Sequence, residues 1–267
     1  MAAVSVADFL AHHGVKGMKW GVRNDRKEIM KNWSNASVQV AENQNAHRMK
    51  ATLNESSYSK LSDDDVVVSK DSQVKRVSAN PYADRFNENL FVSTNAEDAN
   101  TYRGLLASGG YLQKEYAATY ETTYRAVSEL KSPSEKKRVD AYITLMDTPE
   151  IHLHNESITG REYLKRQGLG DTVDKLSSRE LALTYYGQLA VNQGIKNEPI
   201  NTAYFNELKK KGYNALVDDN DRNVISKTPL LVLDSYKHLE EIHVKQLTTE
   251  EIHTAQGTLK IPRYSQK

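Results

Sequence analysis

The residues near the start of the chain that could do chemistry lie in the stretch HHGVKGMKWGVR, residues 12–23. Lys16, Lys19 and Arg23 could meet phosphate groups while Trp20 stacks on a base. Three cations, however, give only weak binding that salt readily removes. The glycines do not follow the G-x-G-x-x-G spacing of a dinucleotide site, and no strand precedes them. The stretch therefore favours neither a dinucleotide site nor a nucleic-acid site.

The apolar side chains of the same stretch predict a protein partner instead. Val15, Met18, Trp20 and Val22 are too many to leave in water in a short segment interrupted by glycine. We expect Met18 and Trp20 to fill pockets on the partner while the cations set the orientation. The alternative is an N-terminal arm that packs on its own domain. The side chains assigned to this docking role are His13, Lys16, Met18, Trp20 and Arg23.

Two other groups of residues have the composition of metal ligands. His152 and His154 in IHLH would share one face of a strand, with Glu156 close by. No third ligand is evident, so we interpret them as two half-buried histidines. The acidic run DDNDRN, residues 218–223, lacks the alternating oxygens and terminal Glu of a calcium loop, which favours a solvated turn. We therefore predict no metal site.

The composition excludes several classes of protein. The chain has 267 residues, a net charge of +1 and no cysteine. This charge gives no overall field to attract nucleic acid or an anionic membrane, and disulfides and thiolate sites are excluded. No apolar run approaches the roughly 18 residues of a membrane span, and no basic region precedes the apolar start of the chain. We expect a soluble protein without membrane contact or sequence-specific nucleic-acid binding.

The chain changes character along its length. Residues 1–32 contain the docking segment, polar residues 33–63 indicate a linker, residues 64–253 predict an α+β domain, and residues 254–267 form a polar tail. Ser134 and Ser177 are expected N-caps, and Gly212 an expected helix stop. Residues 111–130 suit a strand or a helix. Strands are predicted at 65–69, 72–80, 89–95, 213–219 and 228–234, and helices at 95–110, 134–147, 157–169, 177–193, 201–212 and 236–247.

Several of these pieces occur in a characteristic order. Arg76 lies in the strand QVKRVSAN, and the hydroxyl pair Ser93–Thr94 ends the strand LFVSTN. The late stretches KGYNALVDDNDRN and PLLVLDS complete the series. Together they resemble the ADP-ribosyltransferase-like fold, above all its divergent versions in phages and bacterial toxins, over residues 64–247. The resemblance implies small mixed sheets with an inserted helical block, and a cleft that binds NAD.

The resemblance also implies a role for each residue. Arg76 would grip phosphate or ribose through its planar guanidinium. Ser93 and Thr94 would brace the nicotinamide pocket, and Tyr102 (or Tyr82) would stack on the ring. A late carboxylate would stabilise the oxocarbenium-like transition state.

The sequence departs from the family at that carboxylate. Residues 227–229, Lys-Thr-Pro, stand where a catalytic Glu is expected, and Asp219 is the candidate substitute. Because Asp is one methylene shorter, the backbone would have to come closer. The structural alternatives are that Arg76 is an ordinary surface cation on its strand, and that Thr94 or Asn95 simply caps the next helix.

The stretch LAHHGVKGMKWGVR, residues 10–23, has its own resemblance. It is similar to a short segment of many otherwise unrelated, often head-associated proteins of tailed phages and prophages. This implies a phage-head or other virion protein as partner, and a location in the virion or the host cytoplasm. We expect a protein that transfers ADP-ribose from NAD to a host or virion target. The missing Glu favours the alternative, a non-enzymatic virion component that uses the same fold for binding.

Overall fold

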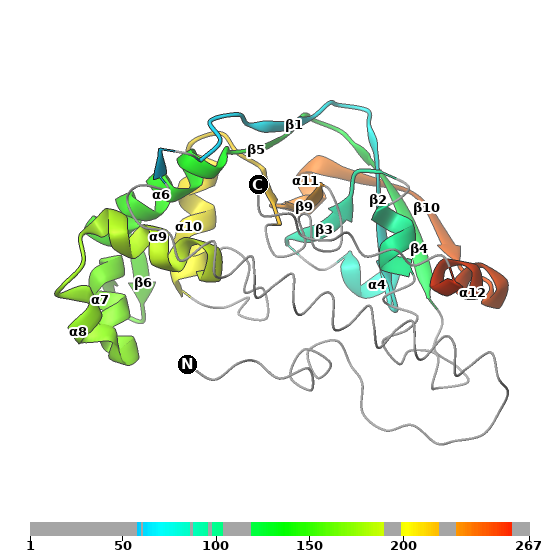
Figure 1. Cartoon of the computed structure of the whole chain (residues 1–267). Coiled ribbons are helices and arrows are strands. Elements are labelled where there is room, and N and C mark those ends of the chain that lie inside the picture. Colours follow the sequence, from blue (N-terminus) through cyan, green and yellow to red (C-terminus); the bar gives the residue numbers. More distant parts are fainter. Residues whose placement is uncertain are drawn as a thin grey trace, which may run out of the picture. The chain divides into compact units, whose positions relative to one another are not determined.

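The computed structural model describes residues 58–59, 61–85, 88–95, 98–103, 119–189, 199–218 and 228–257. These residues divide into two compact units (Figure 1). Unit 1 contains the described residues of 69–129 and 228–257, and unit 2 contains those of 58–68 and 130–218. Both combine helices with short antiparallel strands, so the predicted α+β class is confirmed. The expected domain of residues 64–253 is divided between the two units.

Unit 1 is built on antiparallel strands with β2 among them. Figure 1 shows β2, β4 and β10 side by side. Val74 of β2, Leu90 and Val92 of β3 and every residue of β9 are buried, so these strands supply the core of unit 1. The strands follow the order β10 (Leu239–Gln246), β4 (Tyr120–Ala126), β2 (Gln73–Ser78), β3 (Leu90–Ser93) and β9 (Pro229–Val232).

Short helices connect these strands. Residues 98–103 are helical, and the Asn95 side chain caps them by accepting a hydrogen bond from the Asp98 N–H at 2.8 Å. Thr248 and Glu251 form a capping box, in which the Thr248 hydroxyl accepts from the Glu251 N–H and the Glu251 carboxylate accepts from the Thr248 N–H. The other helices of unit 1 are α4 (Pro81–Asp84), α11 (Ser235–His238) and α12 (Thr249–Gly257).

The predicted helix over residues 236–247 is wrong. Only the single turn α11 is helical, and β10 then pairs with β4 from Leu239 to Gln246, with an irregularity at Ile242. Leu239, Ile242 and Leu247 have helical spacing, but pairing along the whole of β4 outweighs this local pattern. Residues 111–130 suited either a strand or a helix, and the described part of this range is mostly the strand β4.

Unit 2 combines three-residue strands with a group of helices. Beside β5 lies β8, whose Val217 N–H donates to the Ser132 hydroxyl at 2.9 Å. Tyr142 of α6 stacks on Tyr204 of α10 with ring centroids 4.1 Å apart, and both are fully buried. The strands are β1 (Val66–Val68), β5 (Leu130–Ser132), β6 (Ile151–Leu153), β7 (Glu156–Ile158) and β8 (Ala215–Val217). The helices are α6 (Glu135–Asp147), α7 (Gly160–Leu164), the π-helix η2 (Lys165–Leu169), α8 (Gly170–Val173), α9 (Ser178–Leu189) and α10 (Pro199–Lys210).

The predicted helix signals of unit 2 are confirmed. The Ser134 hydroxyl caps α6 by accepting from the Lys137 N–H at 3.3 Å. Ser177 forms a capping box with Glu180 at the start of α9. Gly212, at a φ of 84°, ends α10, and its N–H and that of Tyr213 bond back to the last turn.

Most predicted boundaries shift by one or two residues, and two differences have a clear structural reason. The helix expected from residue 157 begins only at Gly160, capped by Thr159, because Ser157 still belongs to the β6–β7 pair. The end of the expected linker belongs to unit 2, where the Tyr58 hydroxyl donates to Asp140.

The packing of α7 on α6 depends on Gly160. A Cβ atom there would lie 2.6 Å from Met146 Cε and 2.8 Å from the Leu145 carbonyl oxygen. Met146 can adjust its flexible end, but the carbonyl belongs to the α6 backbone and cannot. Gly160 therefore permits the two helices to approach more closely than any other residue would allow.

Replacing Gly160 with Ala should lower the free energy of unfolding by about 1–3 kcal/mol, the usual cost of overpacking a core. Urea unfolding followed by circular dichroism measures this loss. Gly170→Ala is the matched control, because a Cβ at Gly170 meets nothing within 4 Å and its backbone is helical. Equal stabilities of the two variants would contradict the close approach at Gly160.

Candidate functional site

The β2 strand places Lys75 and Arg76 on opposite faces of the unit 1 strands. Successive residues of a strand alternate between faces, whereas directly paired residues on antiparallel strands share one. Lys75 pairs with Ser93 of β3, and Arg76 pairs with Thr122 of β4. Ser93 therefore shares a face with Lys75 and not with Arg76. The expectation that Arg76 and Ser93 line one pocket is wrong, because a single step along β2 separates the two faces.

Arg76 is held by a buried ion pair. Its Nε lies 2.8 Å from Asp84 Oδ2, and its Nη1 donates to the Phe91 carbonyl at 3.2 Å. The Asp84 side chain is only 5% exposed, so the charge of Arg76 is neutralised where water is largely excluded. Tyr124 lies on the same face, where burial, and then the charge of Asp84, raise its pKa to about 12. Arg76 thus attaches α4 to the strands, so its role is structural, but it is not the ordinary surface cation of the structural alternative.

On the opposite face, Glu121 is shared by two cations. Its Oε1 accepts a hydrogen bond from Lys75 Nζ at 2.8 Å, and its Oε2 accepts one from Arg103 Nε at 2.7 Å. The Glu121 side chain is 6% exposed, against 30% for Lys75 and 23% for Arg103. Burial by itself would raise the pKa of Glu121, but the hydrogen bonds and charges of Lys75 and Arg103 outweigh it and lower the pKa. We call these three residues the Glu121 cluster.

Sequence reasoning did not identify the Glu121 cluster. Arg103 and Glu121 are 18 positions apart, in a helical segment and a strand, and only their folded positions bring them together. The sequence did contain a signal. The segments KRV in β2 and ETT in β4 carry charged and polar side chains within strands whose inward-facing residues are normally apolar.

The hydroxyl pair makes local structural contacts. Ser93 is buried at the end of β3, and the Thr94 hydroxyl donates to the Thr228 carbonyl at 3.2 Å. The Thr228 N–H donates to Asp98 Oδ2 at 3.3 Å, so the backbone at the expected Glu position joins β9 to residues 94–98. Asn95 is the residue that caps the next helix.

The remaining predicted residues are separated or outside the described part. Tyr102 is half-buried beside Arg103 in residues 98–103. Tyr82 is 61% exposed and stacks against the Arg85 guanidinium, which binds Glu241. Outside the described residues lie Asp219 and the docking side chains His13, Lys16, Met18, Trp20 and Arg23.

The histidines form no metal site. His152 lies on β6 with its Nδ1 2.8 Å from the Ser157 hydroxyl, while His154 lies in the following turn at a φ of 49°. Both are exposed, which corrects the half-buried interpretation. Among the described residues, no group of three or more His, Cys, Asp or Glu could hold a metal ion.

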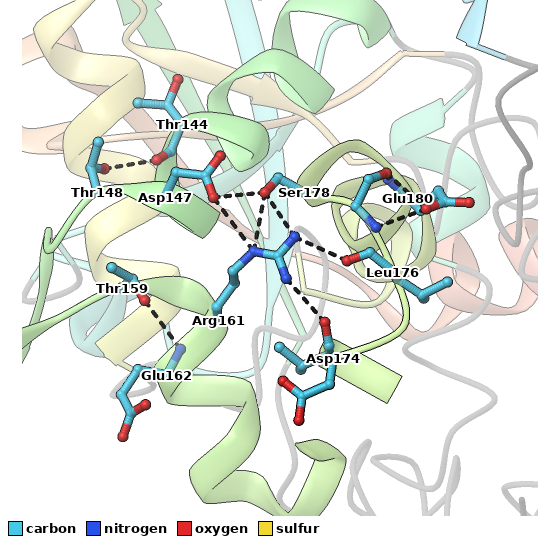
Figure 2. A network of polar contacts seen from close by, with 12 residues as sticks. Thr144, Asp147, Thr148, Thr159, Arg161, Glu162, Asp174, Leu176, Ser178 and Glu180 are labelled. Carbon is cyan, nitrogen blue, oxygen red and sulfur yellow. Dashed lines mark hydrogen bonds and ion pairs between the residues drawn. The ribbon is translucent and has the colours of Figure 1, made fainter. Parts of the chain in front are cut away.

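In unit 2, Arg161 forms a network that the sequence did not indicate. Figure 2 shows its guanidinium directed toward Ser178, beside Asp147. It donates to the Val173 and Leu176 carbonyls, each at 3.0 Å, and the Ser178 hydroxyl lies 2.6 Å from Asp147 Oδ1. The network joins α7 to the loop before α9 and to the end of α6. Its partners are backbone carbonyls and neighbouring side chains, so it stabilises the helices.

The comparisons with known proteins address the first residues of the chain. A family model described as a family of unknown function (DUF7211) matches residues 3–27, which include the docking segment. No curated protein and no solved structure matches the chain. Within the part that the structure describes, no helix has the length and apolar character needed to cross a membrane.

Replacing Arg76 with Ala should lower the free energy of unfolding by about 3 kcal/mol, because Asp84 would remain buried without its cation. Denaturant unfolding measures this change. Arg125→Ala is the matched control, since Arg125 pairs with Glu240 on the surface and both side chains are about half exposed. An Arg76 variant as stable as the Arg125 variant would contradict the structural role.

Glu121 should make stability depend on pH. Its folded-state pKa lies below the ordinary value of 4.5, so its ionised form stabilises the fold above that value. The stabilisation is lost as the pH falls through the lower folded-state pKa. Between about pH 6 and pH 3, Glu121→Gln should therefore show a flatter stability profile than the wild type in urea unfolding. Parallel profiles would show that Glu121 contributes nothing to acid sensitivity.

Proposed function

We propose that the protein is a non-enzymatic binding component of a tailed-phage particle. It docks on a head or other virion protein through residues 10–23, and its folded units serve binding. The observation that supports this proposal most directly is the position of Arg76. The residue expected to grip NAD is paired with Asp84 and lies on the opposite face from Ser93, so it belongs to the framework of unit 1.

The docking role rests on the composition of the segment and on the family match. Met18 and Trp20 offer apolar side chains to a partner, and Lys16 and Arg23 provide charge. The matched residues, 3–27, include all four side chains. A family match confined to this short stretch supports a recognition segment with a role of its own.

One observation favours a second candidate, an ADP-ribosyltransferase-like protein that uses NAD on a host or virion target. β3, which ends at Ser93, pairs along its length with β9, and the helical residues 98–103 carrying Tyr102 follow. This is the order of elements that the family resemblance implies. A cation acting beside Ser93 would then be Lys75, which shares its face.

The docking proposal is tested by incorporation into particles. The full chain is produced together with the virion proteins encoded beside it, and purified particles are analysed by mass spectrometry. We expect the Met18→Ala, Trp20→Ala double variant to be reduced at least tenfold in the particles. Trp33→Ala, which changes the chain's other tryptophan outside the matched residues, should be incorporated normally. Equal incorporation of all forms would contradict docking through residues 10–23.

A labelling experiment separates the two candidates. The chain is incubated with virion and host extracts and NAD that carries a label on its ADP-ribose. The binding proposal predicts no transfer of label. Transfer that is abolished in an Arg76→Ala variant shown by circular dichroism to be folded would overturn that proposal and our assignment of Arg76. Transfer lost in Lys75→Ala and retained in Arg76→Ala would support the second candidate.

A further inference from the structure

We propose that Lys75 and Arg103 of the Glu121 cluster bind a phosphate-like oxyanion, with Ser93 beside them. The site lies on the face of unit 1 opposite Arg76. The proposal gives a ligand class to the binding role proposed above, but it concerns unit 1 alone and does not depend on residues 10–23.

The first argument is charge balance. A single carboxylate faces two cations, so the Glu121 cluster carries a net charge of +1. The Lys75 and Arg103 side chains are each less than one-third exposed, so water compensates this excess only partly. A partly buried, unbalanced positive charge favours the binding of an anion.

This imbalance distinguishes the cluster from the other ion pairs of unit 1. Among the ion pairs in which both partners are described residues of that unit, each other carboxylate meets one cation. These pairs are Arg76–Asp84, Arg85–Glu241, Arg125–Glu240, Lys237–Asp234 and Lys245–Glu251. Glu121 alone in this set is shared by two cations.

The second argument is geometry. The two oxygens of Glu121 hold the Lys75 ammonium and the Arg103 guanidinium on either side of one carboxylate. The ammonium has N–H groups beyond the one donated to Glu121, and the guanidinium has its Nη1. Both side chains are partly exposed, whereas Glu121 is buried. Glu121 is thus a positioning residue that orients two donors toward an incoming oxyanion.

Ser93 adds a hydroxyl on the same face. It is paired directly with Lys75, which places their Cβ atoms roughly 5 Å apart. Tetrahedral oxyanions accept several hydrogen bonds at once, so two cations and a hydroxyl suit phosphate better than a carboxylate ligand.

Calorimetric titration of the full chain with inorganic phosphate, pyrophosphate and NAD tests the proposal. Lys75→Gln and Arg103→Gln should each weaken binding at least tenfold. Arg125→Gln should bind as the wild type does, because Arg125 is on the same face of β4 but has its own carboxylate. Glu121→Gln should strengthen binding severalfold, since it removes the anion that competes for the two cations. Circular dichroism melting confirms that each variant is folded.

Each outcome decides the matter. Tighter binding in Glu121→Gln together with weaker binding in Lys75→Gln supports the site, and a merely structural cluster would not produce these opposite signs. If phosphate and pyrophosphate bind and NAD does not, the ligand of the site is a free oxyanion. If all three bind, the site also accepts the phosphates of a nucleotide. No binding, or equal affinity in Lys75→Gln and Arg125→Gln, overturns the proposal. Such a failure leaves particle incorporation through residues 10–23 unaffected.

Discussion

The pleat of β2 sends two adjacent cations to opposite sides of unit 1, and each cation ends on a buried carboxylate. Arg76 reaches Asp84 at the end of α4, whereas Lys75 reaches Glu121, which also binds Arg103. The helical segments are therefore attached to the strands through charge pairs on two neighbouring strands, α4 to Arg76 of β2 and residues 98–103 to Glu121 of β4. A one-residue shift of β2 would exchange the two faces and leave both carboxylates buried with the wrong partners.

The two faces differ in what they leave for a ligand. In the Arg76–Asp84 pair the two charges neutralise each other, and the guanidinium also donates to a backbone carbonyl. The polar groups of this pair therefore have a structural role. The Glu121 cluster has two cations for one carboxylate, so one positive charge is not neutralised within the cluster. Unit 2 has its own framework, in which Gly160 permits close helix packing and Arg161 joins the helix ends.

Local sequence signals predicted much of the fold. Short apolar runs, some of them β-branched, indicated β1, β2, β3, β8 and β9. Ser134, Ser177 and Gly212 marked helix ends, because side-chain capping and glycine geometry act over a few residues. The helix expected at 236–247 failed because pairing with β4 is a long-range contact that helical spacing does not record.

The candidate site was harder to predict for the same reason. The family resemblance points to Arg76, but the register between β2 and β3 places Lys75, and not Arg76, on the face of Ser93. Register depends on contacts between strands that lie far apart in the sequence, and neither propensity nor motif fixes it. The Glu121 cluster likewise depends on a helical segment meeting a strand 18 positions later.

Double-mutant cycles on unfolding free energy test the two-faced arrangement most directly. Neutral replacements at Lys75 and Arg76 are combined with Asn at Asp84 and Gln at Glu121. The structure predicts coupling above about 0.5 kcal/mol for Lys75 with Glu121 and for Arg76 with Asp84, and additivity for the two crossed pairs. Coupling of Arg76 to Glu121, with none to Asp84, would contradict the register of β2 and everything inferred from it.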